Sequence, residues 1–372
     1  MDSISNSSNP LILAVVIPTF NEAGNVAVLM DKLHQVLNGV NWEVIFVDDD
    51  SPDGTCSTVR DLAARYPNVR CLRRVGRRGL SSACVEGMLS TNARFFAVMD
   101  ADLQHDEKLL PEMLKVLQQD HFDMVVGSRY IEGGGLGDWD SKRQQTSWVA
   151  TVLSQRWLGV SIRDPMSGFF MLRREVLDNT VHRLSNIGFK ILVDLIVSSP
   201  QPLKILELPF HFGQRTVGES KLDNRVVWDF LMLLMDKTVG RYVPVQLLSF
   251  CLIGSAGVLV HLVVLSIGMA LFTDFFLVAQ TAAVIVSMVF NFILNNALTY
   301  RDQRLQAWAW WSGLFKFMLA CAVGAAANVG VASYIYGDIG YWVWSALAGI
   351  LVGVMWNYAA TAILVWPQRR RS

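Results

Sequence analysis

The sequence predicts an α/β domain with a mostly parallel sheet, followed by an all-α domain with four transmembrane helices. In residues 1–240, short apolar runs alternate with helical patterns, as they do in sheets covered by helices. Residues 241–372 contain only seven basic and three acidic residues, although the whole chain has 32 of each. So clear a hydrophobic pattern excludes a disordered chain. The net charge of zero gives no reason to expect a nucleic-acid partner.

The alternation in the first half defines the elements of the expected sheet. Apolar runs of four to eight residues are typical of buried parallel strands, and helices with one apolar stripe cover such sheets. Ligands of these sheets bind beyond the carboxyl ends of the strands. The expected strands are 11–18, 43–47, 69–72, 95–99 and 123–127, and the expected helices are 25–37, 55–66, 80–89 and 108–118.

Acidic residues gather where these strands end. The second strand is followed by the acidic run 48–50, and the fourth is followed by Asp100, Asp102 and Gln104. Carboxylate and amide oxygens are hard ligands that suit Mg²⁺ or Mn²⁺ bridging a pyrophosphate. We therefore predict a divalent cation at these three side chains. The chain contains neither GxGxxG nor GxxxxGK[ST], so neither a dinucleotide site nor a P-loop is indicated.

Basic residues further along the chain suit an anionic substrate. Arginine binds phosphate through a planar fork, and lysine acts as a point charge. We expect phosphate contacts from Arg129, Arg143, Arg215 and Lys221. The glycine-rich segment 131–140 is interpreted as a candidate lid. The basic residues interpreted as solvated surface charges are Arg73, Arg74, Arg77, Arg78 and Lys142.

The second half contains four stretches without Asp, Glu, Lys or Arg, namely 242–273, 275–300, 317–337 and 339–368. Each reaches the roughly 20 residues that a helix needs to cross a bilayer. All seven basic residues fall on one side of these stretches, which the positive-inside rule places in the cytosol. Because the number of spans is even, we expect the N-terminal domain and both termini to be cytosolic.

Three features bear on location and on the junction between the halves. Residues 1–9 carry no positive charge, so we expect no cleaved signal peptide. The five cysteines are scattered without a CxxC pair, which fits a reducing compartment. Residues 223–240 have the pattern of an amphipathic helix, which either lies in the membrane interface or belongs to the core of the soluble domain.

Several motifs occur in a characteristic order. In the first half these are Val16-Ile-Pro-Thr-Phe-Asn-Glu22, Val47-Asp-Asp-Asp-Ser-Pro-Asp-Gly-Thr55, Asp100-Ala-Asp-Leu-Gln-His105, Gly127-Ser-Arg-Tyr130, Asp164-Pro-Met-Ser-Gly-Phe169 and Gly218-Glu-Ser-Lys221. Through them, residues 10–240 resemble family 2 glycosyltransferases with the GT-A (Rossmann-like) fold, of the dolichyl-phosphate mannose synthase type. Residues 243–366 resemble the GtrA-type four-helix membrane domain, through Asn291-Phe-Ile-Leu-Asn-Asn296 and Thr299-Tyr-Arg301.

The resemblance implies a division of the chain into four parts. The parts are an N-terminal tail at 1–9, a GT-A glycosyltransferase domain at 10–222, an interfacial amphipathic helix at 223–240 and a GtrA-like domain at 241–372. The four transmembrane helices of the last part would lie at about 243–272, 276–299, 317–337 and 340–366.

The resemblance also implies roles for individual residues. Phe20 stands where many relatives carry Tyr, so a ring contact remains without the hydroxyl. The choice among Asp48, Asp49 and Asp50 as the base contact stays open. The implied roles are base and ribose binding by Pro18, Phe20, Glu22, Val47 and Asp48 or Asp49; sugar contact by Asp100 and Ala101; metal binding by Asp102, Gln104 and Asp100; lipid-phosphate binding by Arg129, Arg143 and Ser147; and donor-diphosphate binding by Arg215 and Lys221, with Asp100, Asp102 and Arg129 as the catalytic group.

The implied activity is inverting, metal-dependent transfer of a hexose from a nucleotide sugar to dolichyl or undecaprenyl phosphate at the cytosolic membrane face. GDP-mannose is the favoured donor, and UDP-glucose is the alternative because related enzymes share these motifs. A processive polysaccharide synthase is disfavoured, because Gln155-Arg156-Trp157 lacks the QxxRW spacing. A protein of another class, a lipid-linked sugar flippase with a sugar-nucleotide-binding module, is the remaining alternative.

Overall fold

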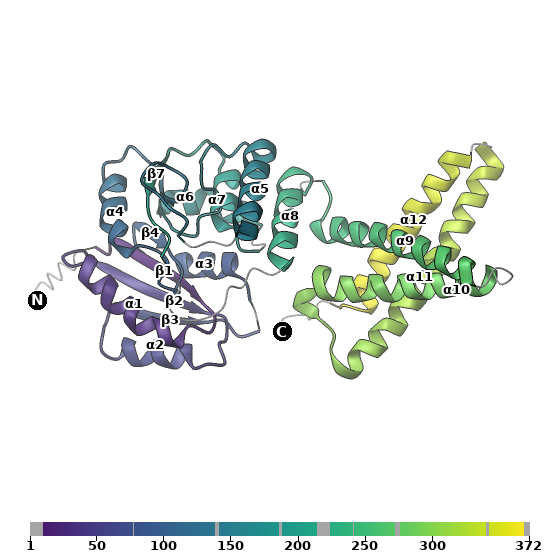
Figure 1. Ribbon diagram of the computed structural model, residues 1–372, viewed down its shortest axis with the longest axis horizontal. Coiled ribbons are helices and arrows are strands. Elements are labelled where there is room, and N and C mark those ends of the chain that lie inside the picture. The colour runs from purple at the N-terminus through teal and green to yellow at the C-terminus, as the bar shows by residue number, and fades with distance from the viewer. Residues whose placement is uncertain are drawn as a thin grey trace, which may run out of the picture. The chain divides into compact units, whose positions relative to one another are not determined.

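The computed structural model describes residues 10–76, 78–137, 141–185, 188–213, 224–240, 242–271, 276–339 and 342–367. Contacts between residues divide the chain into two compact units, unit 1 (residues 1–238) and unit 2 (residues 239–372). Unit 1 is α/β, and the described residues of unit 2 are helical apart from short connections (Figure 1). The fold class predicted from the sequence is therefore confirmed.

Unit 1 is built on a seven-stranded sheet with the order β3-β2-β1-β4-β6-β5-β7. Neighbouring strands are parallel except at β6, which is antiparallel to both β4 and β5. Strand β6 has four residues, which is too short for a periodic signal, and the sequence did not predict it. The strands are β1 Leu13–Thr19, β2 Trp42–Asp48, β3 Val69–Arg73, β4 Phe95–Val98, β5 Met124–Ser128, β6 Phe170–Arg173 and β7 Ile205–Pro209.

Helices cover both faces of this sheet. Helices α1, α2 and α4 bury residues such as Val26 and Leu114 against one face, and α3, α6, α7 and α8 bury residues such as Leu177 and Ile191 against the other. This arrangement leaves the carboxyl ends of the parallel strands open for a site. The helices are α1 Ala23–Val36, α2 Thr55–Ala63, α3 Leu80–Leu89, α4 Leu110–Gln118, α5 Ser141–Leu158, α6 Arg174–Thr180, α7 Ile191–Ser198 and α8 Asn224–Thr238.

Helix α8 is packed on unit 1 through its second half. Phe230, Leu233 and Leu234 belong to the hydrophobic core under the sheet, and the Lys237 ammonium lies 2.6 Å from the Asp194 carboxylate. Near the start of the helix, the Val227 side chain is 52% exposed. The buried part of the amphipathic face therefore belongs to the core of unit 1, whereas Val227 remains exposed.

Unit 2 contains four helices that are long and apolar enough to cross a membrane among its described residues. Helix α9 packs along α10, and α11 packs along α12, so each pair forms a hairpin (Figure 1). Helix α11 begins at Ala307, well ahead of residue 317, and therefore includes Lys316. The helices are α9 Val245–Leu271, α10 Phe276–Leu294, α11 Ala307–Ile339 and α12 Trp342–Leu364, with a π-helical turn at Asn295–Thr299.

Candidate active site

The loops that follow β1 and β2 are hydrogen-bonded to each other at the carboxyl ends of these strands. The Asn21 N–H donates to Ser51 Oγ at 3.0 Å, and the Glu22 N–H donates to Thr55 Oγ1 at 3.0 Å. The Asp53 carboxylate accepts from the Ala23 N–H at 3.1 Å and thereby holds the start of α1. These bonds fix the loops that carry the expected nucleotide contacts before any ligand arrives.

The three consecutive aspartates after β2 have separate partners. Asp48 is fully buried and accepts hydrogen bonds from the amide and hydroxyl of Ser51. Asp49 accepts from the Gly79 N–H at 2.7 Å, and Asp50 accepts from Arg73 Nε at 2.7 Å. Burial raises the pKa of Asp49 above its usual value, although the Gly79 hydrogen bond and the nearby guanidinium of Arg74 oppose this effect.

Arg74 is not a solvated surface charge, so this interpretation of the sequence is wrong. Its side chain is 2% exposed, and its guanidinium contacts the carboxylates of Asp49 at 2.7 Å and Glu86 at 3.4 Å. Its backbone N–H also donates to the Asp48 carbonyl and continues the sheet pairing beyond β3. Local sequence does not reveal this continuation. Arg77 and the side chain of Lys142 lie outside the described residues.

The residues expected at the nucleotide base differ in their accessibility. The guanidinium carbon of Arg78 lies 4.4 Å from the centre of the Phe20 ring, a cation–π contact at the end of β1. The Glu22 carboxylate accepts from Asn25 Nδ2 at 2.8 Å. The Val47 side chain is fully buried in the core, so only its backbone can face a nucleotide. Pro18 is half-buried at the end of β1.

The Asp-Ala-Asp-Leu-Gln turn after β4 is tightly held. The Asp102 carboxylate is nearly buried and accepts from the Gln104 N–H at 3.2 Å. Gln104 Nε2 donates to the Gly213 carbonyl at 2.9 Å, and the Gly213 N–H donates to the Gln104 carbonyl at 2.8 Å. Ala101 is buried. The turn is thus hydrogen-bonded to Gly213, the residue that precedes segment 214–223. This segment, which includes Arg215 and Lys221, lies outside the described residues.

The donor set of this turn fits a divalent cation that shares its ligands with a substrate. Among the described residues, no three His, Cys, Asp or Glu side chains converge as a closed metal site. Asp100 and Asp102 supply carboxylates. Gln104 uses its Nε2 to donate to the Gly213 carbonyl, so its Oε1 is left as the amide atom that can bind a cation. Mg²⁺ is commonly held by one or two carboxylates plus substrate phosphates and water. The three residues therefore fit Mg²⁺ or Mn²⁺, and they do not form a zinc site.

His105 supports the turn from beneath. Its Nδ1 accepts the Asp100 N–H at 3.0 Å, and its Nε2 lies 3.8 Å from the Asp100 carboxylate. The ring stacks on Phe169 at 5.1 Å between centres. Burial lowers the pKa of His105, although the charges of Asp100 and Asp102 oppose this effect. The imidazole is therefore neutral at pH 7, and it positions Asp100.

Arg129 follows β5, and its guanidinium is anchored by a carboxylate for which the motifs predicted no role. Its Nε and one terminal nitrogen each donate to Asp164 at 2.7 Å, and its backbone N–H donates to the same carboxylate at 3.0 Å. Asp164 is fully buried. Tyr130 donates from its hydroxyl to Ser147 Oγ at 3.0 Å, which brings Ser147 to the same region. The side chain of Arg143 lies outside the described residues.

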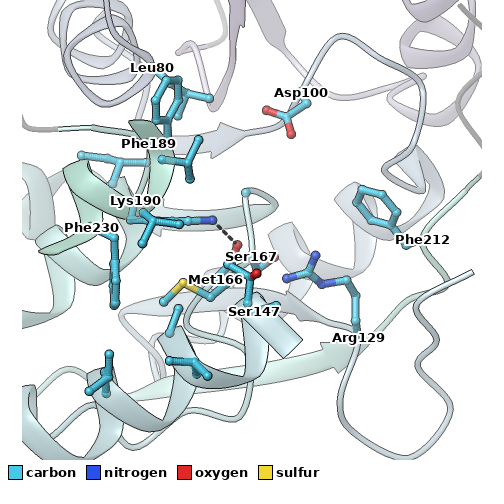
Figure 2. Close-up of a pocket in the computed structure, with 18 of the residues that line it drawn as sticks. Leu80, Asp100, Arg129, Ser147, Met166, Ser167, Phe189, Lys190, Phe212 and Phe230 are labelled. Carbon is cyan, nitrogen blue, oxygen red and sulfur yellow. Dashed lines mark hydrogen bonds between the residues drawn. The ribbon is translucent and has the colours of Figure 1, made fainter. Parts of the chain in front are cut away.

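Asp100, His105, Arg129 and Ser147 face a cavity of about 560 Å³ within unit 1, whereas Asp102 and Gln104 are not among the residues that line it. Figure 2 shows Asp100, Arg129 and Ser147 around it, together with Lys190, whose ammonium donates to the Met166 carbonyl at 3.4 Å. Most of the remaining wall is apolar. It is formed by α3, α5, α8 and the start of α7, through Leu80, Val149, Ala150, Leu153, Phe189, Ile191, Val226, Val227 and Phe230.

Known proteins share this organisation along most of the chain. The family model described as Glycosyl transferase family 2 matches residues 14–181, and the model described as GtrA/DPMS, transmembrane domain, matches residues 249–366. A dolichol-phosphate mannosyltransferase of Pyrococcus furiosus is 32% identical over 359 residues, which cover 95% of this chain and 99% of that protein. The chain belongs to the family 2 glycosyltransferases.

This glycosyltransferase is also similar to two further proteins. The dolichol-phosphate mannosyltransferase of Saccharomyces cerevisiae is 35% identical over 246 residues, which cover 64% of this chain and 91% of that protein. The solved structure of glucosyl-3-phosphoglycerate synthase from Mycobacterium tuberculosis is 17% identical, with a TM-score of 0.48 over 61% of this chain and 79% of that one. Four apolar helices and the transmembrane-domain match make the glycosyltransferase an integral membrane protein.

Sequence reasoning about the glycosyltransferase missed the walls of its cavity. Leu80, Phe189 and Lys190 come from helix starts without a recognisable motif, and α5 was not among the expected helices. Asp164 belongs to the motif Asp164-Pro-Met-Ser-Gly-Phe169, but the motif predicts no separate role for it. A sequence signal for such a partner exists, because an arginine that is buried at a strand end needs a carboxylate beside it. The sequence alone does not reveal which carboxylate lies opposite.

Proposed function

We propose that the protein transfers a hexose from a nucleotide sugar, with GDP-mannose favoured, to the phosphate of a polyprenyl phosphate such as dolichyl or undecaprenyl phosphate. The cavity in unit 1 is the observation that carries this proposal. Asp100, Arg129, Ser147 and Lys190 supply charged and hydroxyl groups to its wall, and most of the remaining wall is apolar, as a phosphate attached to a long apolar chain requires. Curated relatives named dolichol-phosphate mannosyltransferase, 32–37% identical to this chain, support the choice of mannose.

The open side of the cavity is suited to a lipid tail. Val149, Phe189 and Val227 line the cavity and are also 42–52% exposed. Trp148, on the same helix as Val149, is 65% exposed. Exposed apolar groups at the rim of a pocket mark a surface for membrane or apolar partners. A polyprenyl chain could therefore leave the cavity along an apolar rim and continue into a bilayer.

The proposed chemistry needs no general base. The nucleophile is a phosphate oxygen that is already anionic at neutral pH, whereas transfer to a hydroxyl would require proton removal. His105 is consistent with this, because it is neutral and its Nδ1 accepts the Asp100 N–H. The remaining tasks are to hold two anionic substrates together and to align the phosphate behind the anomeric carbon.

The described residues divide these tasks between them. Asp102, Gln104 and Asp100 would hold Mg²⁺ or Mn²⁺, and the bound cation would neutralise the leaving nucleoside diphosphate. Arg129, oriented by Asp164, and Ser147 would bind the lipid phosphate. From the resemblance, Arg143 would join them, and Arg215 and Lys221 would bind the donor diphosphate. Pro18, Phe20 and Glu22, the backbone of Val47, and Asp48 or Asp49 would contact the base and ribose, and Ala101 the sugar.

A single displacement predicts inversion at the anomeric carbon. Transfer in one step from an α-linked nucleotide sugar would give a β-linked lipid phosphate sugar. The configuration can be measured by NMR on the donor and the purified product. A product with the same anomeric configuration as the donor would contradict the single displacement.

We also propose that unit 1 and both chain ends lie in the cytosol. The support is the charge pattern of unit 2, whose connections carry Arg301 and Arg304 at one end of the hairpins, next to α11. Labelling of an engineered terminal cysteine by a membrane-impermeant reagent tests this orientation. We expect labelling only after the cells are opened, and labelling of intact cells would reverse the orientation.

The decisive experiment is a donor screen with the purified full-length protein. Polyprenyl phosphate, Mg²⁺ or Mn²⁺, and either GDP-mannose or UDP-glucose are combined, and both the released nucleotide and the glycosylated lipid are quantified. We expect GDP release matched by mannosyl lipid, and loss of both with a chelator. UDP release with glucosyl lipid would identify the alternative donor. Binding of nucleotide sugar without turnover would favour the flippase with a binding module.

A further inference from the structure

Unit 2 is built from two similar helix hairpins. Phe250 and Gly257 of α9 are matched in α11 by Phe317 and Gly324, 67 residues later. In α10, the sequence Phe290-Asn-Phe292 is matched in α12 by Trp356-Asn-Tyr358, 66 residues later. A match of glycine, asparagine and aromatic positions at a nearly constant separation indicates an internal repeat.

The contacts follow the same repeat. In each hairpin the asparagine of the second helix, Asn291 or Asn357, occupies the space beside the glycine of the first helix. Between the hairpins, Phe250 contacts Tyr358 with ring centres 5.8 Å apart, and the equivalent pair Phe317 and Phe292 is 5.7 Å apart. The side-chain contacts within and between the hairpins therefore match, and the two hairpins cross in Figure 1.

The most central contact joins two equivalent residues. Tyr300 and Trp366 occupy matching positions after α10 and α12, and their rings stack at 4.3 Å with 6° between their planes. A residue that contacts its own counterpart lies close to the axis that relates the two copies. The hairpins are thus related by an approximate two-fold axis, so each residue of one hairpin can be compared with its equivalent in the other.

One polar position breaks this symmetry. In the first hairpin, Ser249 of α9 is buried and its hydroxyl forms a 2.6 Å hydrogen bond with Thr299. The equivalent residues of the second hairpin are Lys316 and Val365, which cannot form such a bond. The structure shows no hydrogen bond or ion pair between Lys316 and any other described residue, and its side chain is exposed. The second hairpin thus places a charge where the first places an internally satisfied hydroxyl.

Lys316 stands at a groove of about 330 Å³ between α11 and α12. The rest of the groove is apolar, and Trp356 forms one side with its indole N–H donating to the Ala320 carbonyl at 3.2 Å. One ammonium beside an otherwise apolar groove is complementary to one anionic headgroup with an attached apolar chain. The groove is lined by Lys316, Leu319, Ala320, Val323, Trp356, Ala360 and Leu364.

The depth of Lys316 suits contact with a headgroup. Trp308 and Trp311, near the start of α11, are 83% and 62% exposed, and exposed tryptophans are typical of the membrane interface. Lys316 follows Trp311 by about 7.5 Å along the helix axis, at 1.5 Å per residue. Side chains of a helix lean toward its N-terminus, and lysine extends its ammonium toward the interface. The ammonium therefore reaches the level of lipid phosphates.

We propose that the α11/α12 groove is a binding site for an anionic phospholipid, with the lipid phosphate at Lys316 and one acyl chain along the apolar wall. This site goes beyond the proposed transfer reaction and does not rest on it. A phospholipid fits better than a second polyprenyl phosphate, because one ammonium matches the single charge of a phosphodiester. Basic pockets between transmembrane helices recognise anionic headgroups in this way.

The test uses the full-length protein in phosphatidylcholine nanodiscs that contain a small fraction of diazirine-bearing phosphatidylglycerol. We expect photolabelling of the α11 and α12 peptides. Lys316→Gln should reduce this labelling about fivefold, the effect expected for loss of one basic residue near an anionic lipid. Ala360→Phe should reduce it as well by filling the groove. Lys316→Arg should retain it, since the charge is kept.

The matched control is Arg304→Gln, which removes one exposed positive charge from the same end of α11 without touching the groove. Its labelling should equal that of the unmodified protein. All variants are compared by size-exclusion profile and thermal stability, so that a folding defect is recognised. Equal labelling of Lys316→Gln and the unmodified protein would overturn the proposal. Equal labelling by a phosphatidylcholine probe, or stronger competition by polyprenyl phosphate than by phosphatidylglycerol, would overturn it too.

Discussion

The two units hold their buried polar groups in place by different means. In unit 1, buried charges meet opposite charges, as Arg129 meets Asp164 and Arg74 meets Asp49. In unit 2, the buried polar side chains among the described residues are neutral, and Asn357 packs directly beside Gly324. Charge is costly within lipid, whereas a buried ion pair in a soluble unit is tolerated when both charges are paired and their hydrogen bonds are complete. Unit 1 therefore depends on charge complementarity and unit 2 on close packing.

The largest expected effect is on turnover. Asp102→Ala removes a carboxylate from the proposed cation site, and we expect transfer to fall about 10³-fold or more, because stabilisation of the leaving diphosphate is lost. The measurement is release of nucleoside diphosphate at increasing Mg²⁺ or Mn²⁺. Glu112→Ala, an exposed carboxylate on α4, is the control and should leave turnover unchanged. Normal turnover of Asp102→Ala would remove the cation site from the proposal.

The ion pair of unit 1 gives the next largest effect. Asp164→Asn leaves the guanidinium of Arg129 buried without its carboxylate, which should cost about 3–5 kcal/mol of unfolding free energy. The double variant Arg129→Met/Asp164→Leu should be less destabilised than Asp164→Asn, because no uncompensated charge remains. Both are compared by thermal unfolding of the purified protein. If the single variant were as stable as the unmodified protein, charge complementarity would not organise this site.

A smaller effect is expected at the lipid phosphate. Arg143→Ala should raise the KM for polyprenyl phosphate about tenfold or more, since a charged hydrogen bond contributes about 1.5–3 kcal/mol. The KM for the nucleotide sugar should stay unchanged, because this residue is assigned to the acceptor. Steady-state kinetics with each substrate varied in turn distinguish the two constants. Unaltered lipid kinetics would exclude Arg143 from the phosphate site.

Close packing in unit 2 can be tested at glycines. A methyl group on Gly324 would overlap the side chain of Asn357, so Gly324→Ala should destabilise the protein by about 1–3 kcal/mol. Gly330→Ala lies on the same helix with open space around it and is the matched control. Gly257→Ala in the first hairpin should behave like Gly324→Ala, because it faces Asn291 in the same way. Thermal unfolding in detergent compares all three, and equal stability would argue against the repeat as a packing unit.

The same contrast explains what the sequence could predict. Strands β1, β2 and β4 and the long apolar helices have strong periodic or compositional signals, and the structure confirms them. Helix α5 has no such signal, because Trp148 and Trp157 remain exposed instead of forming a buried stripe. The polar turn at Asp100 was visible as a motif. The distant partners of the site residues, such as Gly213 for Gln104 and Asp164 for Arg129, depend on which elements lie opposite one another in space, and local sequence does not encode that.

The smallest expected effect concerns pH and the fastening of the loops in unit 1. Partial burial acts against ionisation of Asp53, but hydrogen bonds from Thr55 and the Ala23 N–H outweigh it, and the pKa of Asp53 lies below the usual 3.8. The folded state therefore favours the carboxylate, so its stabilisation is present above pH 3.8 and is lost as the pH falls through the lowered pKa.

Asp53→Asn should consequently lower stability by about 0.5 kcal/mol at pH 7, a value in the lower range for capping residues. The difference from the unmodified protein should shrink as the pH approaches the lowered pKa, because both proteins then carry an uncharged group at this position. Melting temperatures measured from pH 7 downward test this. Asp61→Asn, an exposed position on α2, should show no pH-dependent difference. If the difference in melting temperature between Asp53→Asn and the unmodified protein widened toward acid pH, the loop would not depend on the charge of the Asp53 carboxylate. The contrast between charged groups in unit 1 and neutral groups in unit 2 would then not hold at this site.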